Sequence, residues 1–289
     1  MTGGPDTGAP IAPGRCGVVR PTAGTWWVIA LLTVATGTIL AAGQAPVINA
    51  VVEHRSVGND LARDVQSIAQ RGATTWIGYR VDMLRGRAVR LDWSPTCCGR
   101  CRLQPPTDLV VLARLEAGSI VELRPVAVDC DIDAGGGPLL WFDAVRADES
   151  VAWLNTLVAD NTAPRRVSES ALTALALHAD RSASEALVMM ARGGTTTALK
   201  GRALFWLAQR AADQALPAIT AAIDNDPDTA VKKQAVFALS RMPQDEGIPR
   251  LIDLARHHAN TEVRRQAMFW LGQSRDPRAT EFFADILLN

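Results

Sequence analysis

The cysteines are the residues in this 289-residue chain whose type and spacing are best suited to chemistry. Four of the five lie in the first half of the chain and after its most apolar stretch: Cys97, Cys98, Cys101 and Cys130. In an oxidising compartment four such thiols are expected to form two disulfides, with three possible pairings. Three clustered thiolates and a distant fourth could instead hold zinc, although the spacing leaves a single usable Cys-x-x-Cys.

A redox centre is the third interpretation of the cysteines. Residues 98 to 101 read Cys-Gly-Arg-Cys, which has the spacing of a thiol-disulfide oxidoreductase motif. Such a motif needs a helix after its first cysteine, and Pro105 and Pro106 follow too soon for that helix to run. Disulfides are therefore the favoured prediction, and zinc and a redox centre stay as alternatives.

Three aspartates at alternate positions, Asp129, Asp131 and Asp133, resemble the start of a calcium loop. An EF-hand loop would require glycine at Ala134 and a carboxylate at Leu140, and neither is present. The same alternation fits an edge strand that directs Cys130 and Ile132 inward and the aspartates to solvent, which is the preferred interpretation.

Other catalytic signatures are missing from the sequence: it contains no P-loop, no G-x-S-x-G, no H-E-x-x-H and no G-x-G-x-x-G. His178, His257 and His258 fall at expected helix C-termini, where a structural role with the helix dipole is predicted. We expect neither a metal ion nor a cofactor. Thirty Lys and Arg against thirty Asp and Glu give zero net charge, which argues against nucleic-acid binding.

An uncharged apolar run from Trp26 to Gly43 follows a tail, residues 1–25, that contains Arg15 and Arg20. Its 18 residues are long for the core of a signal peptide and just enough to span a bilayer. Cleavage before Gln44 and a retained anchor are therefore both open. The arginines before the run predict that the tail is cytoplasmic and that the body of the protein is extracytoplasmic, in the periplasm or envelope or secreted.

Residues 51–147 are predicted to form a small α+β domain. A helix is expected around Leu61 to Ala69, and strands are expected in TTWIGYRVDM and from Pro138 to Val145, after three consecutive glycines. The clearest element is a hairpin of LVVLARL and IVELRPVAV around the turn Glu116 to Ser119. Residues 148–167 then read as a cap helix and linker.

From residue 168 to 289 the chain repeats with a period of 32. KGRALFWLAQR, KKQAVFALSRM and RRQAMFWLGQS superpose, and SESALTALALH is a degenerate earlier copy. The second half of each unit has its own apolar position, at Leu187, Ile219, Leu251 and Phe283. Two apolar helices per unit predict four stacked helical hairpins, an α-solenoid, because one hairpin cannot bury its apolar face alone.

The stretches Val231 to Ser240 and Val263 to Gly272 resemble HEAT repeats of the short bacterial type found in phycocyanobilin-lyase-like proteins, whose unit reads roughly V-R-x-x-A-x-x-A-L-G. With WIGY, CCGRC, DCDIDAGG and FWLGQSRDPRA the chain is also similar to a group of exported bacterial HEAT proteins. The resemblance implies an armadillo-type helical fold over about two fifths of the chain and says little about activity.

Phenylalanines recur every 32 residues at Phe205, Phe237 and Phe269, and we call these three residues the aromatic ladder. On a helical projection they point away from the apolar core, toward the concave face of a solenoid. Six polar residues flank them: Arg202, Gln209, Gln234, Arg241, Gln266 and Gln273. This pattern suits binding of an extended polypeptide. The alternative is that each Phe packs laterally between repeats, and Trp206 and Trp270 are expected in the core.

These observations favour a non-enzymatic interaction scaffold, exported or membrane-anchored, with a protein or peptide partner. The alternative is an enzyme, either the oxidoreductase above or a lyase-like HEAT protein. An apolar C-terminal stretch without a polar capping helix also predicts dimerisation or a partner there: Phe282, Phe283, Ile286, Leu287 and Leu288.

Overall fold

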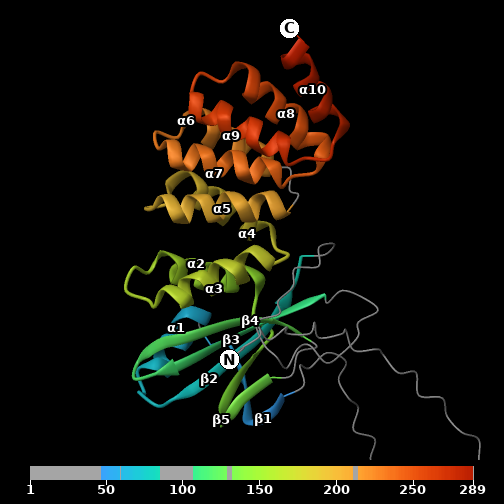
Figure 1. Cartoon of the computed structure of the whole chain (residues 1–289). Helices are drawn as coiled ribbons and strands as arrows, with labels where there is room; N and C mark the ends of the chain where they lie inside the picture. The colour runs from blue at the N-terminus through green and yellow to red at the C-terminus, as the bar shows by residue number, and fades with distance from the viewer. Residues whose placement is uncertain (1–46, 59, 85–106, 129–131, 211–213, 289) are drawn as a thin grey trace, which may run out of the picture.

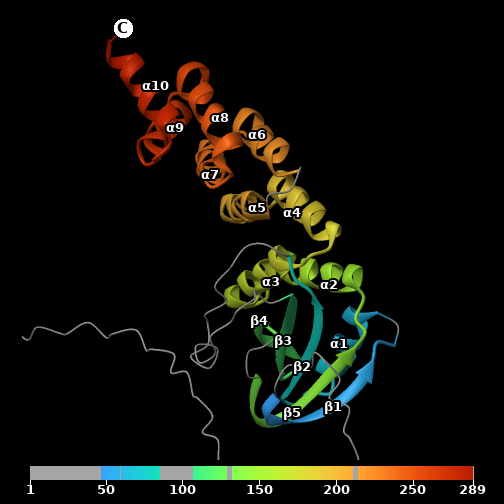
Figure 2. The same ribbon diagram turned by 90° about the vertical axis from the view of Figure 1, so that its right-hand side faces the viewer.

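A five-stranded sheet and a stack of helices make up the chain (Figure 1). The computed structural model describes residues 47–58, 60–84, 107–128, 132–210 and 214–288. In Figure 2, helices α2 and α3 lie across one end of the sheet, and the later helices continue away from it. The helical repeat and the small sheet region predicted from the sequence are therefore both present.

The sheet has the strand order β1-β5-β2-β3-β4. β5 runs parallel to both β1 and β2, whereas β2 with β3 and β3 with β4 are antiparallel. The strands are β1 (Val47–Ser56), β2 (Thr75–Asp82), β3 (Asp108–Glu116), β4 (Ser119–Ala127) and β5 (Ile132–Asp143). β1 was not predicted from the sequence, and β5 was expected as two pieces, an edge strand around Asp133 and a strand from Pro138, separated by the three glycines.

The predicted hairpin is confirmed as β3 and β4. Its two turn residues, Ala117 and Gly118, have φ angles of 49° and 82°. Two consecutive positive φ values are what a two-residue hairpin turn needs to match the right-handed twist of its strands. Glycine at the second position takes this conformation without strain.

The region around Asp133 differs from the predicted edge strand. Ile132 is buried and Asp133 is exposed, as the alternation requires, but β5 lies inside the sheet, between β1 and β2. Gly135 and Gly136, with φ angles of 66° and 78°, accompany a register shift against β1. The three glycines thus bend the strand at a bulge instead of ending it.

Helix α3 contacts β4 and β3, and two earlier helices belong to the same packed unit. α1 (Leu61–Ala69) begins at Asp60, whose carboxylate accepts the N–H of Arg63 at 2.8 Å, and it buries Leu61, Val65 and Ile68. α2 (Ala147–Ala159) is fixed to the centre of the sheet by Tyr79. The Tyr79 hydroxyl lies 2.9 Å from Ser150 Oγ, and its ring meets Trp153 edge to face.

Four helical hairpins follow, and their first helices begin at residues 165, 197, 229 and 261, a spacing of 32. The predicted period is therefore confirmed, although the first unit begins at Arg165 and not at Ser168. The hairpins are α3 (Arg165–Leu177) with α4 (Arg181–Gly193), α5 (Thr197–Arg210) with α6 (Ala215–Asn225), α7 (Thr229–Ser240) with α8 (Gln244–His257), and α9 (Thr261–Gly272) with α10 (Pro277–Leu288).

The repeated alanines and leucines form the solenoid core. Eight equivalent positions in the first helices of the four units are essentially inaccessible: Ala171, Ala203, Ala235, Ala267, Leu175, Leu207, Leu239 and Leu271. In the second helices Leu187, Ile219 and Leu251 are buried as predicted. The last unit departs from the pattern, because Phe282 is buried there while Phe283 is partly exposed.

Polar residues of the repeat close the helix ends. Lys232 Nζ donates to the carbonyls of Ile223 and Asp224 at the end of α6, and Arg264 donates to those of His258 and Ala259 at the end of α8. These carbonyls have no partner within their own helix. A cation in the first turn of a unit therefore fastens that unit to the one before it.

The sheet and the solenoid are joined through main-chain hydrogen bonds. The segment after β2 runs antiparallel to the α3–α4 turn, with Leu84 N 2.8 Å from Leu177 O and Ala179 N 2.9 Å from Asp82 O. Arg210, at the end of α5, reaches back to the same turn. Its buried guanidinium donates to the carbonyls of Ala176 and His178, both at 2.7 Å, and to Ser184 Oγ at 2.9 Å.

Candidate partner-binding surface

The aromatic ladder is formed by equivalent positions of α5, α7 and α9. The rings of Phe205 and Phe237 stack with centroids 6.0 Å apart and planes 7° apart. Both side chains are partly buried, whereas Phe269 is 53% exposed. The first two phenylalanines thus combine lateral packing between repeats with an accessible edge, and Phe269 presents most of its ring to solvent.

Two tryptophans complete this line of rings. Trp206 meets Phe205 at 5.4 Å, and Trp270 lies 4.9 Å from both Phe237 and Phe269. They were expected in the core, and both pack against it while part of each side chain stays exposed. The five rings therefore form a continuous apolar strip across three consecutive units, with Trp270 filling the gap between Phe237 and Phe269.

Two of the six polar residues that flank the ladder hold the helices together, and the other four differ in their exposure. Arg202 donates to Glu169 Oε1 at 2.6 Å, so it links α5 to α3. Gln234 packs onto Gly201, where a β-carbon would collide with Gln234 Oε1, and this oxygen is buried without a partner among the described residues. Gln209 and Gln266 are partly exposed, and Arg241 and Gln273 are exposed.

Arg241 and Gln273 line a pocket of about 310 Å³ between the α7–α8 turn and the α9–α10 turn. Its apolar lining includes Leu239, Ile248, Leu251 and Trp270, and Arg275 lies at its polar side. The indole Nε1 of Trp270 is buried with no acceptor in the described part of the chain. A buried donor without an acceptor costs about 1–3 kcal/mol, so Trp270 is held beside the pocket although its indole N–H is unsatisfied.

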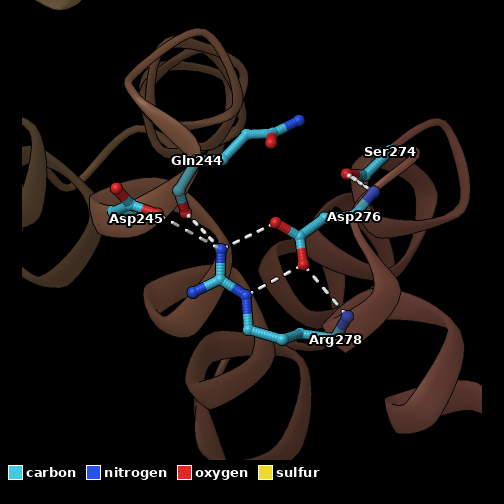
Figure 3. A network of polar contacts seen from close by, with 5 residues as sticks. All are labelled: Gln244, Asp245, Ser274, Asp276 and Arg278. Atoms are coloured by element: carbon cyan, nitrogen blue, oxygen red, sulfur yellow. Dashed lines mark hydrogen bonds and ion pairs between the residues drawn. The ribbon is translucent and has the colours of Figure 1, made fainter.

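A polar network holds the second of these turns against the first (Figure 3). The guanidinium of Arg278 donates to both carboxylate oxygens of Asp276, at 2.8 and 2.7 Å, and to the carbonyl of Gln244 at 3.1 Å. The Asp276 N–H donates to Ser274 Oγ at 3.1 Å. The hydrogen bond from Arg278 lowers the pKa of Asp276, which keeps this carboxylate ionised. The network thereby ties the start of α10 to the start of α8, beside the pocket.

The most strongly shifted titratable groups lie elsewhere, at packing positions. Burial raises the pKa of Tyr79, against the hydrogen bond from Ser150, which lowers it. Burial also lowers the pKa of Arg210 to about 10, and Asp180 opposes this shift. None of these groups faces the pocket or the ladder.

His178 corrects the prediction that the helix-end histidines serve the helix dipole. The side chain is fully buried, and this burial lowers its pKa to about 4, so that it is neutral at pH 7. Its Nδ1 atom accepts the N–H of Asp180 at 3.4 Å. Since a neutral ring cannot complement the dipole, His178 acts instead as an acceptor that shapes the turn, as His258 Nδ1 does for Asn260 N at 3.0 Å.

Several sequence predictions fall outside the described residues: the apolar run 26–43, Cys97, Cys98, Cys101, Cys130 and the aspartates at 129 and 131. Disulfide, zinc and redox interpretations of the cysteines therefore remain predictions. Within the described ranges, no cluster of three or more His, Cys, Asp or Glu is arranged to hold a metal ion. No helix there is both long enough and apolar enough to cross a bilayer.

Comparison with protein families agrees with this geometry. Residues 192–267 match the family model for HEAT repeats, and residues 263–289 match the model for the PBS lyase HEAT-like repeat. This part of the chain is similar to HEAT repeats. The HEAT matches begin at the end of α4, so that the sheet, α2 and most of the first hairpin lie outside them. No curated protein matches the chain by sequence.

Two solved structures are similar to part of the chain. Human deoxyhypusine hydroxylase in complex with glycerol is similar at 20% identity and a TM-score of 0.35, over 42% of this chain and 42% of the hydroxylase. The chain thus matches about two fifths of that enzyme's length. The complex of CpcE and CpcF of phycocyanin lyase from Nostoc sp. PCC7120 is similar at 18% identity and a TM-score of 0.36, over 48% of this chain and 91% of the other.

Proposed function

We propose that this chain is a non-enzymatic scaffold that binds a protein partner on the ring-lined surface of its HEAT helices. The observation that carries the proposal is the strip of five contacting rings that ends in the exposed Phe269, beside Met268, which is 38% exposed. Aromatic side chains supply much of the binding energy at protein interfaces, and a contiguous exposed apolar strip indicates such an interface.

The proposed absence of an enzymatic role has two supports. The sequence carries no signature of a known catalytic centre beyond the ambiguous cysteines. The strongly shifted groups, Tyr79, His178 and Arg210, act in packing or turn formation and do not converge on the pocket. Perturbed groups that converge in a cleft would have pointed to catalysis.

The proposed location is extracytoplasmic, with the chain anchored or released by the segment 26–43. This part rests on the uncharged run and on the two arginines before it. A C-terminal fusion to a reporter enzyme that is active only outside the cytoplasm tests it, and activity is expected. A silent reporter on a stably produced fusion would refute export.

Substitution of Phe269 tests the ladder most cleanly, because Phe205 and Phe237 are half-buried and their truncation would also destabilise the stack. Phe269→Ser should strongly reduce the partner recovered by crosslinking at the envelope. Met189→Ser is the matched control, since Met189 on α4 is 67% exposed and lies away from the ladder, and recovery should persist. Unchanged recovery with Phe269→Ser and native helicity would refute the role of the ladder.

A second contact surface is proposed on α10, where Ile286, Leu287 and Leu288 are 47%, 84% and 84% exposed. Apolar side chains exposed to this degree favour a second copy or a partner. Light scattering at increasing concentration should show a dimer that Leu287→Ser with Leu288→Ser dissolves. A strictly monomeric wild-type protein would count against homodimerisation.

A further inference from the structure

The pocket between the α7–α8 and α9–α10 turns is lined by both apolar and cationic side chains. Leu239, Ile248 and Leu251 lie behind it and are almost fully buried, so its accessible apolar wall is Trp270, which it shares with the aromatic ladder. Arg241 and Arg275 supply the charge. The lining contains no aspartate or glutamate.

The two arginines of the pocket lining differ from their neighbours in having no carboxylate partner among the described residues. Arg250 pairs with Asp253 and Asp224, and Arg278 pairs with Asp276. Arg241 and Arg275 are exposed and make no ion pair with any described side chain. Two unneutralised guanidinium groups around one concave site attract an anion, and the planar fork of a guanidinium matches a carboxylate.

The apolar wall selects the rest of the ligand. A free inorganic anion would gain nothing from the partly exposed Trp270 ring, whereas a peptide segment could lay an apolar side chain on it. The site also continues directly into the ladder through Trp270, which contacts Phe237 and Phe269. A ligand that extends from the pocket along the rings would therefore remain in contact with apolar surface.

We infer that this pocket binds the carboxylate side chain of an internal aspartate or glutamate in an otherwise apolar, extended segment of the protein partner. The carboxylate is held by Arg241 and Arg275, and a neighbouring apolar side chain packs on the Trp270 ring. This inference rests on the proposed function, because it describes the chemistry of the segment that the ladder binds.

Three short peptides test the inference on the full chain: acetyl-Phe-Glu-Leu-amide, its Gln counterpart, and the Gln peptide with a free C-terminal carboxylate. Binding is located by the ¹⁵N–¹H indole signal of Trp270, assigned by its loss in Trp270→Phe. Affinity is measured by titration. We expect the Glu peptide to shift this signal and to bind about tenfold more tightly than the Gln amide at low salt.

The matched variants separate charge from folding. The double variant Arg241→Gln with Arg275→Gln should abolish the preference for the Glu peptide. Arg241→Lys with Arg275→Lys should retain part of this preference. Arg166→Gln should leave it unchanged, since Arg166 is an exposed arginine on α3. Circular dichroism confirms that each variant is folded.

Three outcomes would overturn the inference: equal affinity for the Glu and Gln amides, a preference that survives Arg241→Gln with Arg275→Gln, or no shift of the Trp270 signal. Tighter binding of the free C-terminal carboxylate would overturn the assignment to an internal side chain. These failures are distinct from failure of the proposed function, which the Phe269→Ser crosslinking experiment measures without any assumption about charge.

Discussion

Acidification should destabilise the fold through His178. The ring is fully buried and neutral, with a pKa lowered from 6.5 to about 4 by burial. In the unfolded chain the same ring takes up a proton near pH 6.5. Between these two values the unfolded state binds more protons, so stability rises with pH and is lost as the pH falls from 6.5 toward 4.

The size of the effect follows from the two pKa values. At pH 5 an unfolded histidine is almost fully protonated, while His178 in the folded chain is mostly neutral. The proton linkage then reduces the free energy of unfolding by about 2 kcal/mol relative to pH 8, and the full difference approaches about 3 kcal/mol below pH 4. Carboxylates contribute further losses in the same range, so a difference between variants is needed.

Urea unfolding followed by circular dichroism at pH 5 and pH 8 measures this term. His178→Asn keeps a side-chain acceptor near Asp180 N but does not titrate, so its loss of stability between the two pH values should be smaller than that of the wild type by about 2 kcal/mol. His257→Asn removes an exposed histidine and should behave as the wild type. If His178→Asn loses as much stability as the wild type, burial does not hold this ring neutral and the reasoning fails.

Three further outcomes are expected. Arg210→Met should lower the free energy of unfolding in urea by about 2–4 kcal/mol, because the carbonyls of the α3–α4 turn lose their donors; a loss below about 1 kcal/mol would contradict this. Gly247→Ala should lower the free energy of unfolding by about 1–3 kcal/mol in the same assay, because its β-carbon would lie 2.7 Å from Leu239 O. Gly193→Ala meets nothing within 4 Å and should be neutral or stabilising. Equal effects of the two substitutions would show that the contact with Leu239 O is irrelevant. The four cysteines of the first domain should react with a thiol reagent only after reduction, and a fast-reacting thiol without reductant would favour the redox alternative.

The repeat could be predicted from the sequence because its core positions have a single physical requirement. Ala235 and Leu239 must fit between close helices, so the same residue types return every 32 positions and the helix starts follow them. The hairpin could be predicted for a similar reason, because Gly118 marks a turn between two strands with alternating apolar residues.

Elements that depend on distant partners were missed. β1 buries little of its own surface, with Val51 70% exposed, and it is a strand because β5 pairs with it along one edge. Gly135 and Gly136 read locally as a break, although the strand continues through them as a bulge. Such pairings are set by the tertiary fold and leave no periodic signal.

The candidate site was predicted in part. The 32-residue spacing predicted the aromatic ladder. An idealised helical projection placed Trp270 in the core, whereas its ring lies between two ladder residues and beside the pocket. The pocket itself forms where the turn of one hairpin meets the turn of the next. Its shape depends on how successive hairpins are rotated, which the sequence of one unit does not specify.

The backbone pairing between the segment after β2 and the α3–α4 turn has a mechanical consequence. A flexible linker would let the helices rotate freely relative to the sheet. Here two main-chain hydrogen bonds join the segment after β2 to the α3–α4 turn, and Arg210 holds the same turn from α5. A partner bound on the five rings would therefore keep a fixed orientation relative to the sheet.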